Sequence, residues 1–567
     1  MLFKLLIIHL FLCQCDAVWT KFELVRPWDG QGSEWELPFV KINGANGGPP
    51  VAPSAEFGKA VANIGDLDGN GIDDIMVGAR GEVSIVNGTM SSQAGAVYVL
   101  FMYSSGENHL AVQSYQRISS NDGNGPPLLE NAFFGTSVCA IGDVDGDGVM
   151  DVAVGAPGAR VSATYILFMN SNGTVKDRVI LGSGLEEFEY VIDNVRWATG
   201  SPPLGYFANF GSMVAPMGDF DKDGIPDLII GAADASGGFS KVYMCFLNSD
   251  GSIKSYVKLS SGENGTPEYG TFDKFGSSVV MLGDVNNDNI TDIAVGAEDG
   301  RDPESSVSQA GQIYICMLNE DATIKAFTKI DALAQADKGF ALPLVQFDNC
   351  GAAVTSIGDV NKDHIRGKYA PQLKDPSKGF YSIPDVIVGC PQGGAGTLPG
   401  RSFIFYLTPE GGNQGYTELP HALDKFNTEY VNTTIPNIAP ELKAKDQFGT
   451  SADAYMDLDG NGMKEVIFGA PGDHDNGYNT GAIYIFFLRR RRFHPVPFDY
   501  WMYYITLLTP IAVYCTLCCG GLKLFFWYFR RKPDEIEIMV KNSNIEITKN
   551  RERTVAKFDS KVYVDEY

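Results

Sequence analysis

The sequence predicts an all-β fold, a β-propeller of six four-stranded blades followed by one C-terminal transmembrane helix. A count of seven blades is kept as an alternative. Three observations predict this arrangement. A block containing Phe-Gly or a close relative, an apolar run, an Asp-rich loop and a strand that ends in Gly-Ala or, in the fifth copy, Gly-Cys recurs six times along the 567 residues. The spacing of these blocks suits four strands each. An uncharged stretch from Tyr500 to Leu522 is long enough to cross a bilayer as a helix.

The repeated blocks define the length of one blade. Their first loop aspartates are 77, 76, 65, 75 and 98 residues apart, which is longer than most solenoid units. The blocks open at Phe57, Phe134, Phe210, Phe275, Cys350 and Phe448. Each is followed by an apolar run such as VYVLF, YILFM or IYICM. These runs are β-branched and aromatic and lack helical periodicity, so they predict inner or middle strands that are buried on both faces.

The ends of the repeat array predict how the ring closes. The sixth block stops at its third strand, GAIYIFFL, whereas an extra strand, FVKINGANGGPP, precedes the first block at Phe39. That extra strand resembles the fourth strands YQRISSNDGNGPP and YVKLSSGENGTP. We therefore expect the N-terminal strand to complete the last blade, which leaves no exposed sheet edge. A degenerate seventh blade remains an alternative within 176–208 or 408–447.

The Asp-rich loops carry the candidate chemistry. Their common pattern is Asp-x-Asp-x-Asn/Asp-Gly-x-x-Asp, with side-chain oxygens at positions 1, 3, 5 and 9 and a backbone carbonyl at position 7. Calcium prefers six to eight such oxygen ligands, and glycine permits the tight turn that brings them together. The candidate calcium ligands of the five best loops are Asp66, Asp68, Asn70, Ile72, Asp74, Asp143, Asp145, Asp147, Val149, Asp151, Asp219, Asp221, Asp223, Ile225, Asp227, Asp284, Asn286, Asp288, Ile290, Asp292, Asp457, Asp459, Asn461, Met463 and Glu465.

Three loops depart from the pattern. The fourth has Asn289 in place of glycine, and asparagine also tolerates left-handed geometry. The sixth ends in Glu465, whose longer side chain still reaches. The fifth keeps Asp359, Asn361, Asp363 and Ile365, but 18 residues intrude before Asp385, so we expect about five calcium sites. A single acidic turn is as typical of a solvated hairpin as of a calcium loop. Six copies in register favour the calcium loop, because a bound cation would relieve the repulsion between the carboxylates.

The two termini predict a membrane protein. Residues 1–17 have the apolar run and small-residue cleavage site of a signal peptide. The predicted organisation is an extracellular propeller at 18–488, a basic juxtamembrane linker at 489–499, a transmembrane helix at 500–522 and a cytoplasmic tail at 523–567. The signal peptide places the N-terminus outside, giving a single-pass type I protein of the cell membrane. Sequons at Asn87, Asn172, Asn264 and Asn432 predict a glycoprotein.

Composition narrows the functional classes. The net charge of −25 argues against nucleic-acid binding, which requires clustered Lys and Arg. The predicted extracellular part has five cysteines, an odd number, and Cys245 and Cys316 occupy equivalent strands. We expect these two to be small buried hydrophobes. The sequence contains neither Gly-x-Ser-x-Gly nor His-Glu-x-x-His, so we predict that the protein is not an enzyme.

The phrases FG and GDxDGDGxxDxxVGAP resemble the FG-GAP repeats in the propeller of integrin alpha chains, across residues 57–488. The resemblance implies a propeller, calcium bound between the first two strands of a blade, and extracellular adhesion or ligand recognition by loops. The chain departs from that family in passing from its last blade almost directly to the predicted membrane span, without β-sandwich leg domains. It also has LKLFFWYFRRK where integrin alpha chains carry Gly-Phe-Phe-Lys-Arg. Pairing with an integrin beta-like chain therefore stays open.

The predicted function is adhesion or recognition of an extracellular protein or glycan ligand. The connections between strands two and three, and between consecutive blades, vary most in length, as recognition loops on a rigid scaffold do. They carry the candidate contact residues Arg80, Arg160, Arg196, Trp197 and Tyr206. A propeller that serves as co-subunit of another membrane protein is the alternative, and a propeller hydrolase is a weaker one.

Overall fold

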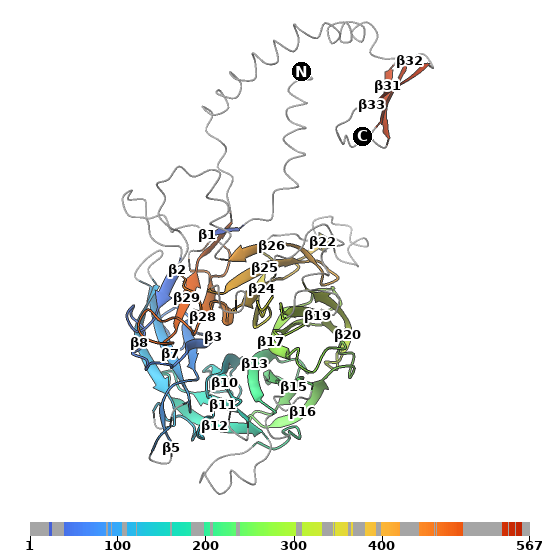
Figure 1. Cartoon of the computed structure of the whole chain (residues 1–567). Coiled ribbons are helices and arrows are strands. Elements are labelled where there is room, and N and C mark those ends of the chain that lie inside the picture. Colours follow the sequence, from blue (N-terminus) through green and yellow to red (C-terminus); the bar gives the residue numbers. More distant parts are fainter. Residues whose placement is uncertain are drawn as a thin grey trace, which may run out of the picture. The chain divides into compact units, whose positions relative to one another are not determined.

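The computed structural model describes residues 39–86, 89–182, 198–301, 309–331, 344–366, 380–419 and 442–490 with shorter gaps, together with 22–24 and three strands within 536–557. The chain divides into two compact units, 1–491 and 492–567. In the first unit, six four-stranded antiparallel sheets surround a central axis (Figure 1). In the second, β31 (Ile536–Lys541), β32 (Asn544–Lys549) and β33 (Glu552–Lys557) form an antiparallel meander.

The six sheets are the blades, and each is given from its innermost to its outermost strand. Blade 1 consists of β3 (Phe57–Gly65), β4 (Asp74–Ala79), β7 (Ala96–Ser104) and β8 (Leu110–Ile118). Blade 2 consists of β9 (Ser137–Gly142), β10 (Asp151–Ala156), β11 (Ala163–Met169) and β12 (Val175–Gly182). Blade 3 consists of β13 (Phe210–Gly218), β14 (Asp227–Ala232), β15 (Lys241–Leu247) and β16 (Ile253–Leu259).

The other three blades have the same order. Blade 4 consists of β17 (Phe275–Gly283), β18 (Asp292–Ala297), β19 (Gln312–Leu318) and β20 (Ile324–Ile330). Blade 5 consists of β21 (Ala353–Gly358), β24 (Asp385–Cys390), β25 (Arg401–Leu407) and β26 (Asn413–Leu419). Blade 6 consists of β27 (Ser451–Ala454), β28 (Val466–Ala470), β29 (Ala482–Phe486) and β2 (Phe39–Ile42). Three short ladders lie outside the blades: β5 (Ser84–Val86) with β6 (Thr89–Ser91), β22 (Ile365–Arg366) with β23 (Phe380–Tyr381), and β1 (Phe22–Leu24) with β30 (Leu488–Arg490).

The N-terminal strand closes the ring as the sequence predicts. Strand β2 pairs antiparallel with β29, and Val40 lies opposite Ile485. Successive innermost strands contact one another from β3 through β9, β13, β17 and β21 to β27, which returns to β3. The two stretches that were left open for a seventh blade instead supply the fourth strands β12 and β26. The propeller therefore has six blades.

Burial explains why these segments form the middle of each blade. Every residue of β4, β10, β14, β18 and β24 is buried, and the same is true of β11, β19, β25 and β29. The expectation of strands covered on both faces is confirmed. The outermost strand β16, at the edge of its sheet, instead has exposed residues at its centre.

Blade 5 contains a disulfide that the sequence analysis did not assign. Cys350 and Cys390 are bonded to each other. In blade 1 the corresponding positions are Phe57 and Ala79, which lie opposite each other across β3 and β4. The bond thus replaces an apolar pair that the repeat otherwise uses. Cys245 and Cys316 are free and fully buried, as predicted, and Cys139 is free and buried as well.

The predicted signal peptide at 1–17 and the predicted transmembrane helix at 500–522 lie outside the described residues. Among the residues that the structure does describe, none forms a helix with the length and apolar character needed to cross a membrane.

Candidate metal centre and central channel

The Asp-rich loops join the first and second strands of each blade and lie at one end of the innermost strands. In blades 1, 2 and 3, the loop carboxylates at positions 1, 3 and 9 offer oxygen atoms that all lie within 4.8 Å of one another. These groups are Asp66, Asp68 and Asp74; Asp143, Asp145 and Asp151; and Asp219, Asp221 and Asp227. Three of the five predicted ligands of each loop, those at positions 1, 3 and 9, are therefore brought together in the three loops that match the pattern best.

The first aspartate of each loop shapes the turn. In blade 1, Asp66 Oδ1 accepts a hydrogen bond from the Asn70 amide at 2.9 Å, and its Oδ2 accepts one from the Gly71 amide at 2.7 Å. Equivalent bonds fold the second, third and fourth loops. In the fourth loop, Asn289 takes the place of glycine with a φ of 65°, as its tolerance of left-handed geometry predicts.

The last carboxylate of each loop is buried and fastens three strands together. Asp74 Oδ2 accepts a hydrogen bond from the Leu67 amide at 3.0 Å, while its Oδ1 accepts one from the Met102 amide at 2.9 Å, at the far end of the third strand. The same pair of bonds is made by Asp151, Asp227, Asp292, Asp385 and Glu465. This carboxylate therefore has a structural role in all six blades, including the interrupted fifth.

Burial also shifts the pKa values of these last carboxylates. It raises the pKa of Asp74, Asp151, Asp227 and Asp292 to about 6, although two backbone amides per side chain oppose the shift. A divalent cation beside such a group would favour its ionised form. Each carboxylate oxygen has a second lone pair besides the one that accepts the amide. The donor set of the first three loops therefore fits a hard cation such as calcium.

Lysines from the outermost strands lie against three of these loops. Lys176 contacts Asp145 at 2.6 Å and also Asp147. Lys254 contacts Asp221 at 2.6 Å and Asp223 at 2.7 Å, and Lys325 contacts Asp288 at 2.9 Å. Lys176 and Lys254 lower the pKa of Asp147 and Asp223 by hydrogen bonding. The sequence analysis did not foresee these lysines, although all three follow the first residue of a fourth strand.

Several predicted ligands are not tested by this geometry. Asp459 and Asn461 of the sixth loop lie outside the described residues, as do Asn361 and Asp363 of the fifth loop, which was not counted as a site. In the fourth loop, Asn286 provides an amide where the first three loops have a carboxylate. The fourth and sixth sites, and the backbone carbonyls at position 7, remain predictions.

Comparison with known proteins identifies the repeat. The sequence model of the FG-GAP repeat matches residues 57–100, 134–169 and 275–316, which fall within three different blades. This chain carries an integrin-alpha-like FG-GAP propeller.

The related proteins share a limited part of their length with this FG-GAP chain. It is 33% identical over 192 residues to integrin alpha ina-1 of Caenorhabditis elegans, a match that covers 32% of this chain and 15% of that protein. It is 32% identical over 180 residues to integrin alpha-3 of Mus musculus, covering 31% and 14%. Integrin alpha-PS5 of Drosophila melanogaster is 30% identical over 167 residues, covering 29% and 15%. The match therefore spans less than a sixth of each relative.

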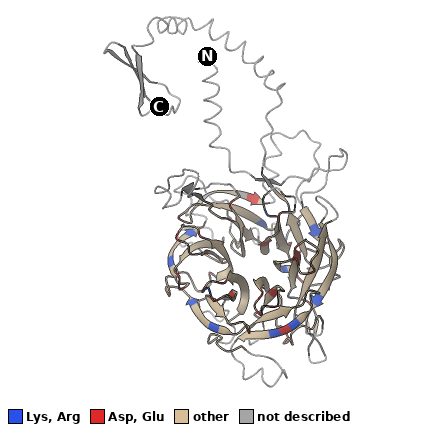
Figure 2. Ribbon diagram, turned by 180° about the vertical axis from the view of Figure 1, so that it is seen from behind, with Lys and Arg blue, Asp and Glu red and all other residues tan. Residues whose placement is uncertain are grey.

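The FG-GAP propeller also has a cavity that sequence analysis missed. It has a volume of about 880 Å³ and is lined by all six innermost strands and the residues just before them. Because β3 begins with Phe57-Gly58 and ends at the Asp-rich loop, this cavity lies at the FG end, away from most of the acidic loops. Figure 2 shows that Lys and Arg also mark the outer strands of the ring.

One predicted contact residue belongs to this cavity. Arg80 lines it and pairs with Glu56 at 2.6 Å, and its guanidinium lies 5.8 Å from the centre of the Phe133 ring. The other candidate contact residues, Arg160, Arg196, Trp197 and Tyr206, lie outside the described residues.

Proposed function

We propose that this chain is a calcium-binding, membrane-anchored extracellular receptor whose propeller recognises a protein or glycan ligand. The observation that carries the proposal is the convergence of three carboxylates within 4.8 Å in each of three loops of an integrin-alpha-like propeller. The propeller supplies a rigid scaffold, and the connections at the FG end supply the variable surface. In this proposal the protein binds rather than catalyses.

Calcium would neutralise the loop carboxylates of the first three blades. Asp66, Asp143 and Asp219 would hold it together with the other acidic positions of their loops, so the cation would fasten the first and second strands of each blade. The fourth and sixth loops are proposed as further sites, giving about five in total. We exclude the fifth loop from this count because its last carboxylate is separated by an insertion.

Calcium binding is tested by calorimetry and thermal unfolding of the full chain in detergent. We expect saturable calcium binding and a melting temperature that falls when a chelator removes the ion, because a ligand that binds only the folded state stabilises it. The double variant Asp143→Asn and Asp145→Asn should lose one site. Asp177→Asn, on the outer strand of the same blade, is the matched control and should keep it. Unchanged melting with and without chelator would eliminate the calcium proposal.

The membrane orientation is tested on intact cells. We expect residues 18–488 outside and 523–567 inside, with 489–499 as linker and 500–522 as the span. Asn172 is exposed in the turn between β11 and β12, so its sequon is accessible to glycosylation. An endoglycosidase should increase the gel mobility of the wild type, and the variant Asn172→Gln should show a smaller change. A chain that non-permeant biotin cannot reach would contradict this orientation.

A co-subunit role is the second candidate function. It is favoured by the short distance in sequence between the last blade, which ends at Phe486, and the predicted span that begins at Tyr500. Surface cross-linking of the full chain would distinguish the two roles. A receptor for extracellular ligands should be cross-linked only when ligand is supplied, whereas a co-subunit should be cross-linked to a membrane protein of the same cell without it.

A further inference from the structure

The cavity at the FG end has an aromatic side chain at its edge that the fold does not bury. Phe272 lines this cavity and is 65% exposed. It lies in the connection between blades 3 and 4, just before β17. A single exposed aromatic residue is common on protein surfaces, but one at the edge of a cavity offers an apolar contact to a ligand.

A tight turn holds Phe272 in this exposed position. The Asp273 amide donates a hydrogen bond to the Gly270 carbonyl at 3.2 Å, and the Gly270 amide donates one to the Asp273 carboxylate at 2.7 Å. Asp273 is buried, and Tyr269, before the turn, stacks on Phe275 with ring centres 4.6 Å apart. The turn is therefore anchored at both ends, so a ligand that contacts Phe272 would order little additional backbone.

Polar side chains that follow β18 and precede β21 lie beside this turn. The Asp299 amide donates a hydrogen bond to the Asp273 carbonyl at 3.3 Å, so Asp299 lies next to the residue that follows Phe272. Asp299 Oδ1 in turn accepts a hydrogen bond from Asn349 Nδ2 at 2.6 Å. Phe272, Asp299 and Asn349 all line the cavity. The aromatic ring and these polar side chains therefore belong to one surface.

Two glutamines extend this surface around Asn349. The Asn349 amide donates a hydrogen bond to the Gln309 carbonyl at 3.3 Å, and the Gln392 amide donates one to the carbonyl of Asp348 at 3.4 Å. Both glutamines line the cavity, and within the described residues neither side chain makes a hydrogen bond. Each side-chain amide offers an acceptor and a donor in one plane. We refer to the set as the polar wall, which consists of Asp299, Gln309, Asn349 and Gln392.

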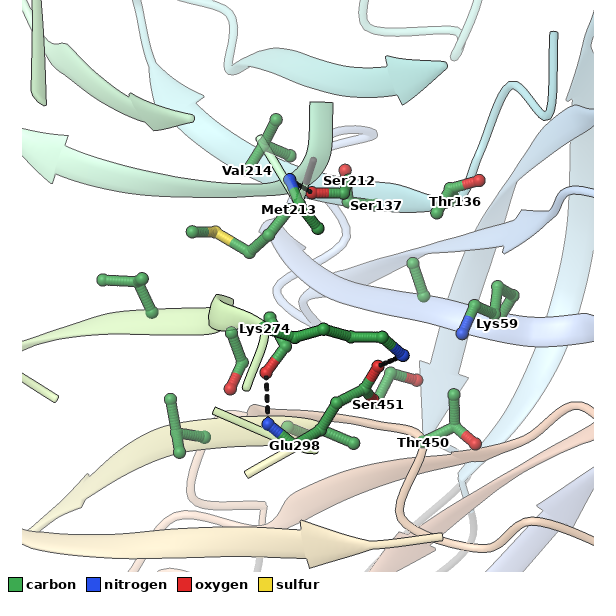
Figure 3. Close-up of a pocket in the computed structure, with 18 of the residues that line it drawn as sticks. Lys59, Thr136, Ser137, Ser212, Met213, Val214, Lys274, Glu298, Thr450 and Ser451 are labelled. Carbon is green, nitrogen blue, oxygen red and sulfur yellow. Dashed lines mark hydrogen bonds and ion pairs between the residues drawn. The ribbon is translucent and has the colours of Figure 1, made fainter. Parts of the chain in front are cut away.

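The charges at the polar wall are balanced. Lys274 contacts Glu298 at 2.7 Å and Asp299 at 3.0 Å, and Figure 3 shows the side chains of Lys274 and Glu298 directed toward each other. Arg301 also lines the cavity, so two cations accompany two carboxylates at this wall. A charged ligand of either sign would find no excess of opposite charge here. The wall therefore favours a neutral ligand that both donates and accepts hydrogen bonds.

We propose that the FG end of the channel binds a neutral sugar ring, which packs on Phe272 and forms hydrogen bonds with the polar wall. A pyranose ring has a face of C–H groups that fits an aromatic ring. Each hydroxyl at its edge donates one hydrogen bond and accepts others, which suits neighbouring amide and carboxylate groups. The cavity volume of about 880 Å³ lies within the range of small-ligand pockets, about 300–1,000 Å³.

The inference rests on the proposed recognition role and names the class of ligand for it. It does not involve the calcium loops, because the acidic loops of blades 1 to 3 lie at the other end of the innermost strands. A purely apolar ligand would leave the polar wall without hydrogen bonds once water is displaced, which costs free energy. A neutral peptide segment is the competing ligand class, and the test includes it.

The test measures the binding of neutral methyl glycosides by saturation-transfer difference NMR. The four probes are the methyl glycosides of glucose, galactose, mannose and N-acetylglucosamine. The full chain is used after treatment with an endoglycosidase and in a detergent without a sugar headgroup, so that no other sugar competes. We expect at least one glycoside to bind saturably, with a Kd on the order of 1 mM, as is usual for so small a ligand. N-acetylneuraminic acid, which is anionic, should bind about tenfold more weakly or not at all.

Variants of Phe272 test the aromatic contact, and they should fold because the side chain is exposed. Phe272→Ala should weaken glycoside binding about five- to tenfold, whereas Phe272→Trp keeps an aromatic face and should retain binding. Gln392→Ala should weaken it about threefold. Tyr103→Ala is the matched control, because Tyr103 is 41% exposed but follows Met102 at the acidic-loop end of β7. This variant should bind like the wild type.

The outcomes separate the inference from its alternatives. Binding that Phe272→Ala weakens and Tyr103→Ala leaves unchanged would support the sugar site. If none of the four glycosides binds, or if Phe272→Ala binds them as well as the wild type does, the inference is wrong. It is also wrong if only the neutral peptide N-acetyl-Gly-Gln-Gly-amide gives a signal that depends on Phe272. The receptor role and calcium binding are measured separately, by surface cross-linking and calorimetry, so their failure remains distinguishable from this result.

Discussion

Gly469 in blade 6 and Gly58 in blade 1 lie against each other where the ring closes. A Cβ atom on Gly469 would lie 1.9 Å from the Gly58 carbonyl oxygen, and the Ser451 hydroxyl donates to that same oxygen at 3.0 Å. Gly58 itself has a φ of 88°. Gly58 belongs to the FG part of one repeat and Gly469 to the Gly-Ala part of another. The glycines of the repeat motif therefore form the close contact between these neighbouring blades.

Replacing Gly469 by alanine should therefore loosen the closure. We expect Gly469→Ala to reduce the free energy of unfolding by about 2–3 kcal/mol, because the added methyl group meets backbone that cannot move aside. Gly415→Ala is the control, since its Cβ would be 3.4 Å from the Tyr406 side chain. Urea unfolding of both variants measures the difference. Equal stability of the two would contradict a tight contact between blades.

The disulfide of blade 5 should be replaceable by the pair that other blades use. Removing it with Cys350→Ser and Cys390→Ser should cost about 2–4 kcal/mol, because both positions are buried and the crosslink is lost. The pair Cys350→Phe and Cys390→Ala should recover part of this loss by restoring the Phe57 and Ala79 arrangement. Thermal unfolding under non-reducing conditions measures all three proteins. No recovery with the Phe and Ala pair would show that blade 5 has diverged in packing.

Lys254 should compete with calcium at the third loop. Its ammonium contacts Asp221 and Asp223, which are candidate metal ligands. We expect Lys254→Met to strengthen calcium binding at this loop roughly two- to five-fold, a modest factor because exposed ion pairs are weak. Calorimetry with Lys258→Met as control measures the change. Weaker calcium binding in Lys254→Met would mean that the lysine supports the loop rather than competes for it.

The ionisation of Asp475 should make the stability of the ring closure depend on pH in the acid range. Hydrogen bonds from Lys41, on β2, and from Lys443 lower the pKa of Asp475 to about 2. Because this value is below that of the unfolded chain, about 3.9, the ionised group stabilises the fold above pH 4. That contribution is lost as pH falls from about 4 to about 2.

The variant Asp475→Asn tests whether the ionised Asp475 stabilises the fold. It should be less stable than the wild type at pH 7, by less than about 1 kcal/mol since the side chain is partly exposed. The difference in melting temperature should shrink as pH falls from 4 to 2. A difference that is constant over this range would assign the effect to packing instead of charge.

The sequence by itself determined the repeat, the strand types and the way the ring closes. These features are local or periodic: apolar runs identify the middle strands, and an unpaired strand at Phe39 matches a last blade that lacks one. The acidic loops were also predictable, because their ligands lie within nine residues of chain. Even the tolerance of Asn289 for a positive φ follows from its residue type.

Only the tertiary structure decided which residues from different strands and blades act together. It paired Cys350 with Cys390, directed both oxygens of Asp74 to backbone amides, and placed Lys254 against the third acidic loop. Such contacts join residues that are distant in sequence, and their geometry arises only when six sheets converge on one axis. The pattern of residues therefore predicts the propeller, and the packing of its blades determines what it can bind.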